Sequence, residues 1–205
     1  MIKCDVTLCG IISRSAVCKQ SSDSSSFISF VVNIPLSGSD GTAADLYVGI
    51  SAPGDDKTTE KYSTGKKVQI SGTMYIRNSG DHTFFNLRAE KIEDISFVTS
   101  SETERITGSM RFLGKIKKEI KDHINSKNQK PFQTFSAFSS DKDGENAIGY
   151  TWVNFFNPKP LQADWFKPDT YVEVRGELSL RVYKNNISIE CRTNNIKQWQ
   201  LLEKK

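Results

Sequence analysis

The sequence repeats its own pattern. A shift of 104 residues places Gly10 on Gly114 and Gly72 on Gly176, and it keeps the apolar residues around both glycines in the same phase. Between these two blocks the matching shift is 105 residues. A nearly constant offset that preserves glycines and apolar phase rarely arises by chance, so the repeat predicts two copies of one domain.

The two copies are predicted to meet in the polar stretch of residues 99–103. We place the boundary between Ser100 and Ser101, so that the domains cover residues 1–100 and 101–205. Each copy is long enough to bury a core of its own.

Within each copy, apolar and polar residues alternate, which is typical of strands with one buried face. Five such segments occur per copy. They are residues 5–13, 27–36, 45–52, 67–78 and 83–92 in the first copy, and 106–117, 132–139, 149–157, 171–183 and 186–196 in the second. The pattern predicts an all-β protein made of two tandem five-stranded OB-fold barrels.

The connections fit the same barrels. Residues 57–62 and 160–166 are expected to form the helix or turn that closes each barrel, and residues 78–81 and 184–185 suit hairpin turns. Residues 114–125 are ambiguous, because isoleucines every four residues also fit an amphipathic helix. We extend the strand to Lys117 and allow a helical turn after it.

Composition indicates a globular protein that lies outside the membrane. Hydrophobic residues make up 37% and charged residues 25%, and the mean hydropathy is -0.47. The longest apolar runs are far too short for a bilayer, and the first residues lack the pattern of a secretion signal. We therefore expect a cytoplasmic protein.

The four cysteines, Cys4, Cys9, Cys18 and Cys191, lack the spacing of a zinc site. The first three could form a bridge, but reduced thiols fit a cytoplasmic protein better. The sequence also lacks a phosphate-binding glycine loop and the common hydrolase motifs, and both histidines stand in polar, turn-like stretches. We expect no enzymatic activity, no metal and no cofactor.

The net charge of +4 is unevenly distributed. Residues 1–100 carry 10 basic and 11 acidic side chains, whereas residues 101–205 carry 18 and 13, a surplus of +5. A basic surplus in one half suggests an anionic partner, although solvated surfaces also show surpluses of this size.

Strand alternation separates a core face from an outer face. In residues 149–157, Val153 and Phe155 share the core phase, and the outward set is Tyr150, Trp152, Asn154 and Phe156. Exposed aromatics are what unstacked bases need, since stacking contributes about 1–3 kcal/mol per base. The alternative is that another element or a partner chain buries them.

Other aromatic residues are candidates for the same role. Tyr47 is the aromatic residue in the matching strand of the first copy, which makes that copy the weaker predicted binder. Phe27, Phe132 and Phe138 take the outward phase of the second strands. The residues that flank the last hairpin of each copy are Tyr75, Phe84 and Tyr183.

Cations that could track phosphates are Lys115, Lys117, Lys118 and Lys121, with Lys127 and Lys130 further along the same segment. Arg77 and Arg181 occupy equivalent repeat positions, which makes both candidates for a phosphate contact. A solvated loop explains the lysines equally well, and a structural salt bridge explains either arginine.

Several segments resemble the bacterial single-stranded DNA-binding protein family, in its double-barrel form. In the first copy they are residues 6–10 and 64–72, and in the second 151–154 and 166–176. The resemblance implies OB-fold barrels and binding of single-stranded DNA in replication, recombination or repair. The family usually ends in an acidic tail that recruits other proteins. Residues 201–205 are unlike such a tail, so we do not expect that recruitment here.

The leading hypothesis is therefore non-specific binding of single-stranded DNA by stacking on aromatics and by phosphate contacts. An OB protein that binds RNA is a rival, because such faces do not encode the sugar. A second rival is an assembly module without nucleic acid, in which the aromatic face joins copies of the chain, for example as a homodimer.

Overall fold

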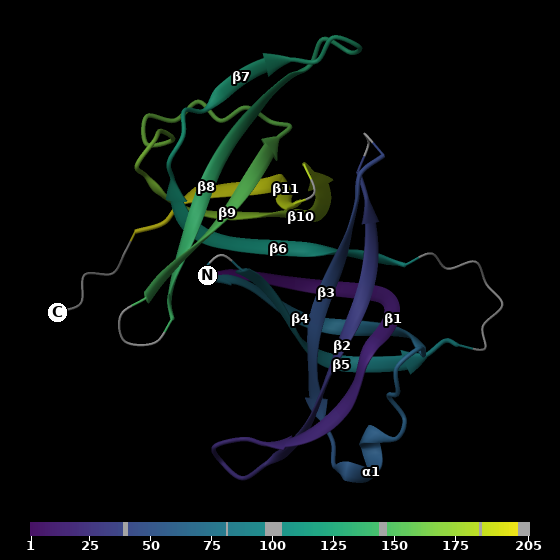
Figure 1. Cartoon of the computed structure of the whole chain (residues 1–205). Coiled ribbons are helices and arrows are strands. Elements are labelled where there is room, and N and C mark those ends of the chain that lie inside the picture. The colour runs from purple at the N-terminus through teal and green to yellow at the C-terminus, as the bar shows by residue number, and fades with distance from the viewer. Residues whose placement is uncertain (39–40, 81, 97–103, 144–146, 185, 201–205) are drawn as a thin grey trace.

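The computed structural model describes residues 1–38, 41–80, 82–96, 104–143, 147–184 and 186–200. It is an all-β protein, as predicted, and it forms two closed OB-fold barrels (Figure 1). The strands of barrel 1 are β1 (Ile2–Gln20), β2 (Ser26–Ser37), β3 (Ala43–Pro53), β4 (Lys67–Ser79) and β5 (His82–Asp94). Those of barrel 2 are β6 (Arg105–Ile116), β7 (Lys121–Ile124), β8 (Pro131–Asp143), β9 (Ala147–Asn157), β10 (Tyr171–Tyr183) and β11 (Asn186–Gln198).

Each barrel closes because its first strand pairs on both edges. In barrel 1, β1 pairs with β2 and with β4, and the circle is completed through β3 and β5. In barrel 2, β6 pairs with β8 and β10, and β9 and β11 complete it. Strand β3 pairs in parallel with β5, and β9 pairs in parallel with β11, while the other neighbours within each barrel are antiparallel.

The strand register repeats at the offsets found in the sequence. Val6 pairs with Gly72, and Met110 pairs with Gly176, 104 residues later. The β2–β3 and β8–β9 ladders correspond at an offset of 105. The predicted pair of five-stranded barrels is confirmed, whereas the boundary proposed between residues 100 and 101 lies outside the described residues.

Two of the repeated glycines sit where strands approach closely. Gly72 and Gly176 each follow a register shift between the last two strands of their barrel. A Cβ atom on either one would lie 2.2 Å from a carbonyl oxygen of the neighbouring strand. Only glycine fits there without a backbone shift, which explains why both copies carry it.

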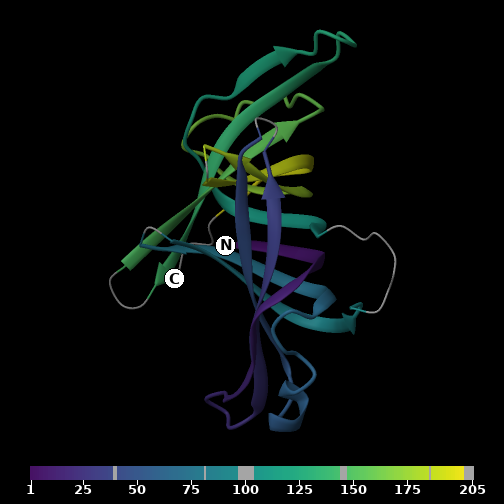
Figure 2. The ribbon, with the colours of Figure 1, turned by 45° about the vertical axis from the view of Figure 1, so that its right-hand side comes forward.

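The two barrels are joined along a seam between β1 and β6, which lie side by side at the centre of the molecule (Figure 2). The seam is antiparallel and runs from Ile2 opposite Phe112 to Cys9 opposite Arg105. Asp5 pairs with Ser109, its own counterpart at an offset of 104, so the seam has pseudo-two-fold symmetry. One continuous sheet therefore runs through both barrels.

The expected helical turn after Lys117 is wrong. Strand β6 ends at Ile116, and a second strand, β7, follows at residues 121–124. An amphipathic helix would bury all three isoleucines of this segment, but Ile124 is 69% exposed. Antiparallel pairing with β8 satisfies the backbone instead, and this outweighs the four-residue apolar spacing.

Strand β7 is the counterpart of the second half of β1. Val17 pairs with Ser29 in barrel 1, and Lys121 pairs with Thr134 at the matching place in barrel 2. The strand that continues to Gln20 in barrel 1 is thus interrupted at residues 117–120 in barrel 2. In both barrels this segment pairs with the second strand, β2 or β8, and the two project together beyond the barrel (Figure 1).

The closing segments differ between the copies. Residues 56–59 form the short helix α1 (Asp56–Thr59), whose N-terminus is capped by Asp55. The second segment, around residues 160–166, is irregular and places Phe166 in the core. No helix in the described part of the chain has the length and apolar character needed to cross a bilayer.

The core of barrel 2 is aromatic. Phe135 stacks on Phe155 with ring centroids 4.7 Å apart, and Phe166 and Phe112 contact this pair edge-on at 5.2 and 5.0 Å. The four cysteines are reduced thiols, as expected, and burial raises the pKa of Cys4 and of Cys191 to about 12.

Candidate nucleic-acid interface

The outer face of β9 carries the predicted aromatic residues. Val153 and Phe155 are buried, whereas Tyr150 is 48% and Trp152 45% exposed. Asn154 is also exposed, and Phe156 is half-buried. The predicted strand phase is therefore confirmed, because side chains of a strand alternate between its two faces.

Strand β8 adds to this face to form a first aromatic cluster. Phe138 pairs with Trp152 across the ladder, and its ring centroid lies 5.5 Å from that of Trp152 and 5.3 Å from that of Tyr150. The ammonium group of Lys118 lies 5.9 Å from the centre of the Trp152 ring. An exposed indole beside a cation is suited to stack a base and contact its phosphate.

A second aromatic cluster lies nearer strand β7. The ring centroids of Phe132 and Phe156 are 5.0 Å apart, and His123 stacks on Phe132 at 4.8 Å. The guanidinium group of Arg192, on β11, lies 5.3 Å from the centre of the Phe156 ring. This cluster repeats the combination of aromatic ring and cation.

A polar residue, Asn154 on β9, separates the two aromatic clusters, and its position is called the polar step. Asn154 lies between Trp152 and Phe156 along β9, and its Oδ1 accepts a hydrogen bond of 2.8 Å from Ser136 on β8. Its Nδ2 donates to Ser188 on β11 at 3.3 Å. The outer face of β8 and β9 thus alternates between stacking surfaces and hydrogen-bonding groups.

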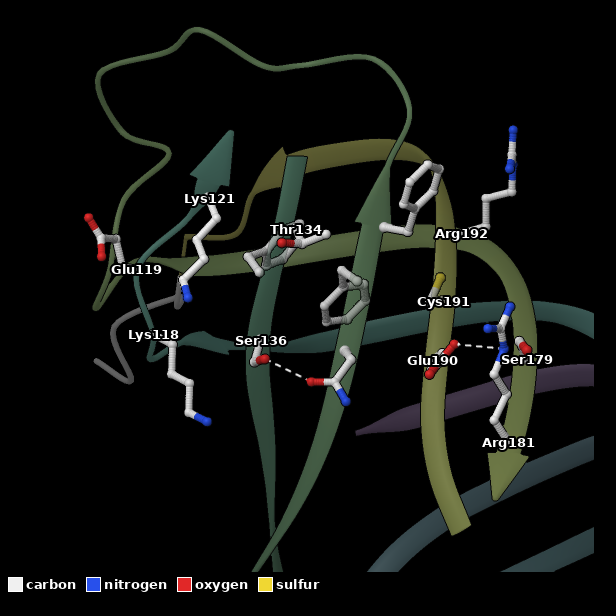
Figure 3. Close-up of a pocket in the computed structure, with 14 residues that line it drawn as sticks. Lys118, Glu119, Lys121, Thr134, Ser136, Ser179, Arg181, Glu190, Cys191 and Arg192 are labelled. Atoms are coloured by element: carbon white, nitrogen blue, oxygen red, sulfur yellow. Dashed lines mark hydrogen bonds and ion pairs between the residues drawn. The ribbon is translucent and has the colours of Figure 1, made fainter. Parts of the chain in front are cut away.

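An open hollow of about 690 Å³ lies on this side of barrel 2. Figure 3 shows Lys118 and Lys121 on one side of it and Arg181 and Arg192 on the other, across β8 and β9. Its floor includes Thr134, Ser136, Asn154, Phe156, Ser179 and Glu190. A hollow with cations on both sides and aromatic and polar groups between them fits a nucleotide chain.

The structure divides the predicted lysines into two pairs. Lys118 and Lys121 line the hollow. Lys115 and Lys117 instead point to Asp169, at 3.0 and 3.7 Å. The hydrogen bond and charge of Lys115, together with Lys117, lower the pKa of Asp169. The two lysines of the second pair therefore share one carboxylate, which offsets one of their two positive charges.

The arginines of barrel 2 have different surroundings. Arg181 forms an ion pair with Glu190, with Nε and Oε2 3.1 Å apart (Figure 3). At the equivalent place in barrel 1, Arg77 is exposed and Asn86 replaces Glu190. Because Glu190 offsets the charge of Arg181, we expect Arg181 to attract a phosphate less strongly than Arg77 does.

The remaining predicted residues lie away from the hollow. Tyr47, Tyr75 and Phe84 are 55%, 41% and 44% exposed, but they belong to β3, β4 and β5 of barrel 1. Tyr183 is 63% exposed at the end of β10, where Lys184 approaches its ring at 5.4 Å. The structure thus gathers the predicted residues of β9, Lys118, Lys121 and Arg181 in barrel 2.

Sequence reasoning missed several groups in the hollow, namely Glu119, Thr134, Ser136, Ser179 and Glu190. Two of them, Thr134 and Ser136, have the outward phase of β8, so strand alternation could have found them. Glu190 enters because β11 pairs in parallel with β9, which no local pattern reveals.

Solved structures similar to this chain include single-stranded DNA-binding proteins. The wild-type single-stranded DNA-binding protein from Thermus aquaticus matches 100% of this chain and 96% of its own, with a TM-score of 0.50 and 9% identity. The mitochondrial single-stranded DNA-binding protein of S. cerevisiae matches 44% of this chain and 91% of its own, with a TM-score of 0.36 and 16% identity. A small single-stranded DNA-binding protein from Streptomyces coelicolor matches 50% and 97%, with a TM-score of 0.36 and 13% identity.

No protein-family model and no curated sequence matches the chain. The likeness to the Thermus aquaticus protein extends over the whole chain at low identity, so it concerns the fold and not individual residues. This chain therefore shares the fold of that single-stranded DNA-binding protein.

Proposed function

We propose that barrel 2 binds single-stranded DNA without catalysing a reaction. The observation that carries the proposal is the exposed Trp152, packed beside Phe138 and beside Lys118, which lines a hollow with cations on two sides. Bases would stack on the two aromatic clusters, while Lys118, Lys121 and Arg192 neutralise phosphates. Binding of single-stranded DNA by similar proteins, the Thermus aquaticus protein among them, agrees with this proposal.

Barrel 1 is proposed to contribute less. The counterparts of Trp152, Asn154 and Phe156 at an offset of 105 are Tyr47, Gly49 and Ser51. The stacking surface on β3 is thus reduced to one ring. Residues 1–100 also carry a net charge of -1, which gives phosphates little attraction.

Titration with oligo-dT should quench tryptophan fluorescence. The chain has three tryptophans, and Trp152 is the one on the aromatic face, since Trp165 packs against the core and Trp199 against Tyr171. A Trp152→Phe variant should bind with similar affinity in a gel-shift assay but lose most of the quenching. An unchanged fluorescence signal together with no gel shift contradicts the proposal, and a parallel titration with oligo-U tests the preference for DNA.

Salt should weaken binding, and the two lysine pairs should differ in their share of that effect. Removing Lys118 and Lys121 together should reduce the slope of log K against log salt by about 1.4, the value for two phosphate contacts on a single strand. The matched control removes Lys115 and Lys117, which face Asp169, and should change the slope less. A wild-type slope in the variant that lacks Lys118 and Lys121 would remove these two lysines from the site.

The assembly alternative makes a different prediction for the same surface. If the aromatic face joins two copies of this chain, Trp152→Ala should convert a dimer to a monomer in light scattering. If the face binds DNA, the variant should keep the oligomeric state of the wild type and lose affinity. The two measurements therefore separate a DNA interface from an interface between copies.

A further inference from the structure

The polar step on β9 has unused hydrogen-bonding capacity. Asn154 offers two lone pairs on Oδ1 and two N–H donors on Nδ2. Its contacts to Ser136 and Ser188 use one acceptor and one donor and hold the amide from both sides. Among the groups that the structure describes, one lone pair and one N–H of this exposed amide remain for a ligand.

A carboxylate stands directly beside this amide. Glu190 is the register partner of Asn154 in the parallel β9–β11 pair, and both residues line the hollow. Arg181 contacts Oε2 of Glu190 at 3.1 Å, which fixes the carboxylate in place. The hollow therefore presents two neighbouring acceptors, the amide oxygen of Asn154 and the carboxylate of Glu190.

Two neighbouring acceptors favour a partner with several N–H donors. Adenine, cytosine and guanine each carry an exocyclic amino group, whereas thymine and uracil carry one ring N–H and no amino group. A carboxylate accepts well from such an amino group, as glutamate does from cytosine N4. A base stacked on Trp152 or Phe156 would bring its edge to this step, because residues two apart on a strand are about 7 Å apart.

We infer that the hollow of barrel 2 selects bases that carry an exocyclic amino group over thymine and uracil. The inference rests on the proposed function and adds base selectivity to it. Barrel 1 lacks the same groups at the equivalent places, because Gly49, Phe84 and Asn86 stand where barrel 2 has Asn154, Ser188 and Glu190. Selectivity would thus belong to barrel 2 alone.

The test compares oligo-dC with oligo-dT, two pyrimidines that differ at the amino group. Labelled strands of about 16 nucleotides, long enough for one barrel, are titrated with the full chain and followed by fluorescence anisotropy. We expect dC to bind about tenfold more tightly than dT, as for one good base-edge contact. Glu190→Gln and Asn154→Ala should each reduce this ratio to about threefold or less. Glu190→Gln should also strengthen dT binding, since Arg181 is released for a phosphate.

Asn86→Ala is the matched control in barrel 1, and it should leave the ratio unchanged. A wild-type protein that binds dT as tightly as dC or more tightly overturns the inference. A preference for dC that persists in both barrel 2 variants overturns it as well. Absence of binding to either strand would instead contradict the proposed function itself, so the two failures are distinguishable.

Discussion

Replacing Trp152 with alanine should reduce the affinity for single-stranded DNA by roughly 5- to 150-fold, the equivalent of about 1–3 kcal/mol for one base stack. The free energy of unfolding should fall by less than about 1 kcal/mol, because the side chain is 45% exposed on the outer face. Fluorescence anisotropy of a labelled oligo-dT measures the first quantity. Urea denaturation measures the second.

Tyr47→Ala provides the matched control, since Tyr47 occupies the equivalent position in barrel 1. It is even more exposed, at 55%, but its strand carries Gly49 and Ser51 where barrel 2 carries Asn154 and Phe156. Its loss should therefore cost less affinity than the loss of Trp152. Equal effects of both variants would show that the barrels share the strand equally, and no effect of Trp152→Ala would remove the aromatic face of β9 from the site.

Much of the fold was predictable because the sequence contains it twice. The offset of 104 residues aligned Gly72 with Gly176, and the structure shows why a glycine is required at both places. Strand alternation then separated Val153 from Trp152, since the period of a strand is two residues. A barrel strand with one buried face therefore produces an alternation of apolar and polar residues that is visible in the sequence.

The parts that sequence reasoning missed depend on contacts between distant residues. Glu190 reaches the hollow through the parallel pairing of β11 with β9, and Asp169 neutralises Lys115 from 54 residues further along the chain. Neither contact has a local signature. The wrong helical turn has a related cause, because pairing of β7 with β8 overrides the spacing of the isoleucines.

Core positions should respond in the opposite way to the outer face. Phe135 is 4% exposed and stacks on Phe155, with Phe166 edge-on. Truncating it leaves a cavity among rings that cannot collapse easily, so Phe135→Ala should lower the free energy of unfolding by about 3–5 kcal/mol. All three tryptophans lie in residues 152–199, so tryptophan fluorescence in a urea titration reports the unfolding of barrel 2.

Phe132→Ala is the matched control, because it removes the same side chain from the outer face of the same strand. Phe132 is half-buried between His123 and Phe156, and its loss should cost about 1 kcal/mol of stability.

Far-ultraviolet circular dichroism, which follows both barrels, tests the role of the β1–β6 seam. Because the seam joins the two barrels, the Phe135→Ala variant should unfold in one transition that is shifted to lower urea in both signals. Equal stability losses from both phenylalanine variants would show that the two faces of β8 are assigned wrongly, and with them the aromatic face that the proposed DNA site requires.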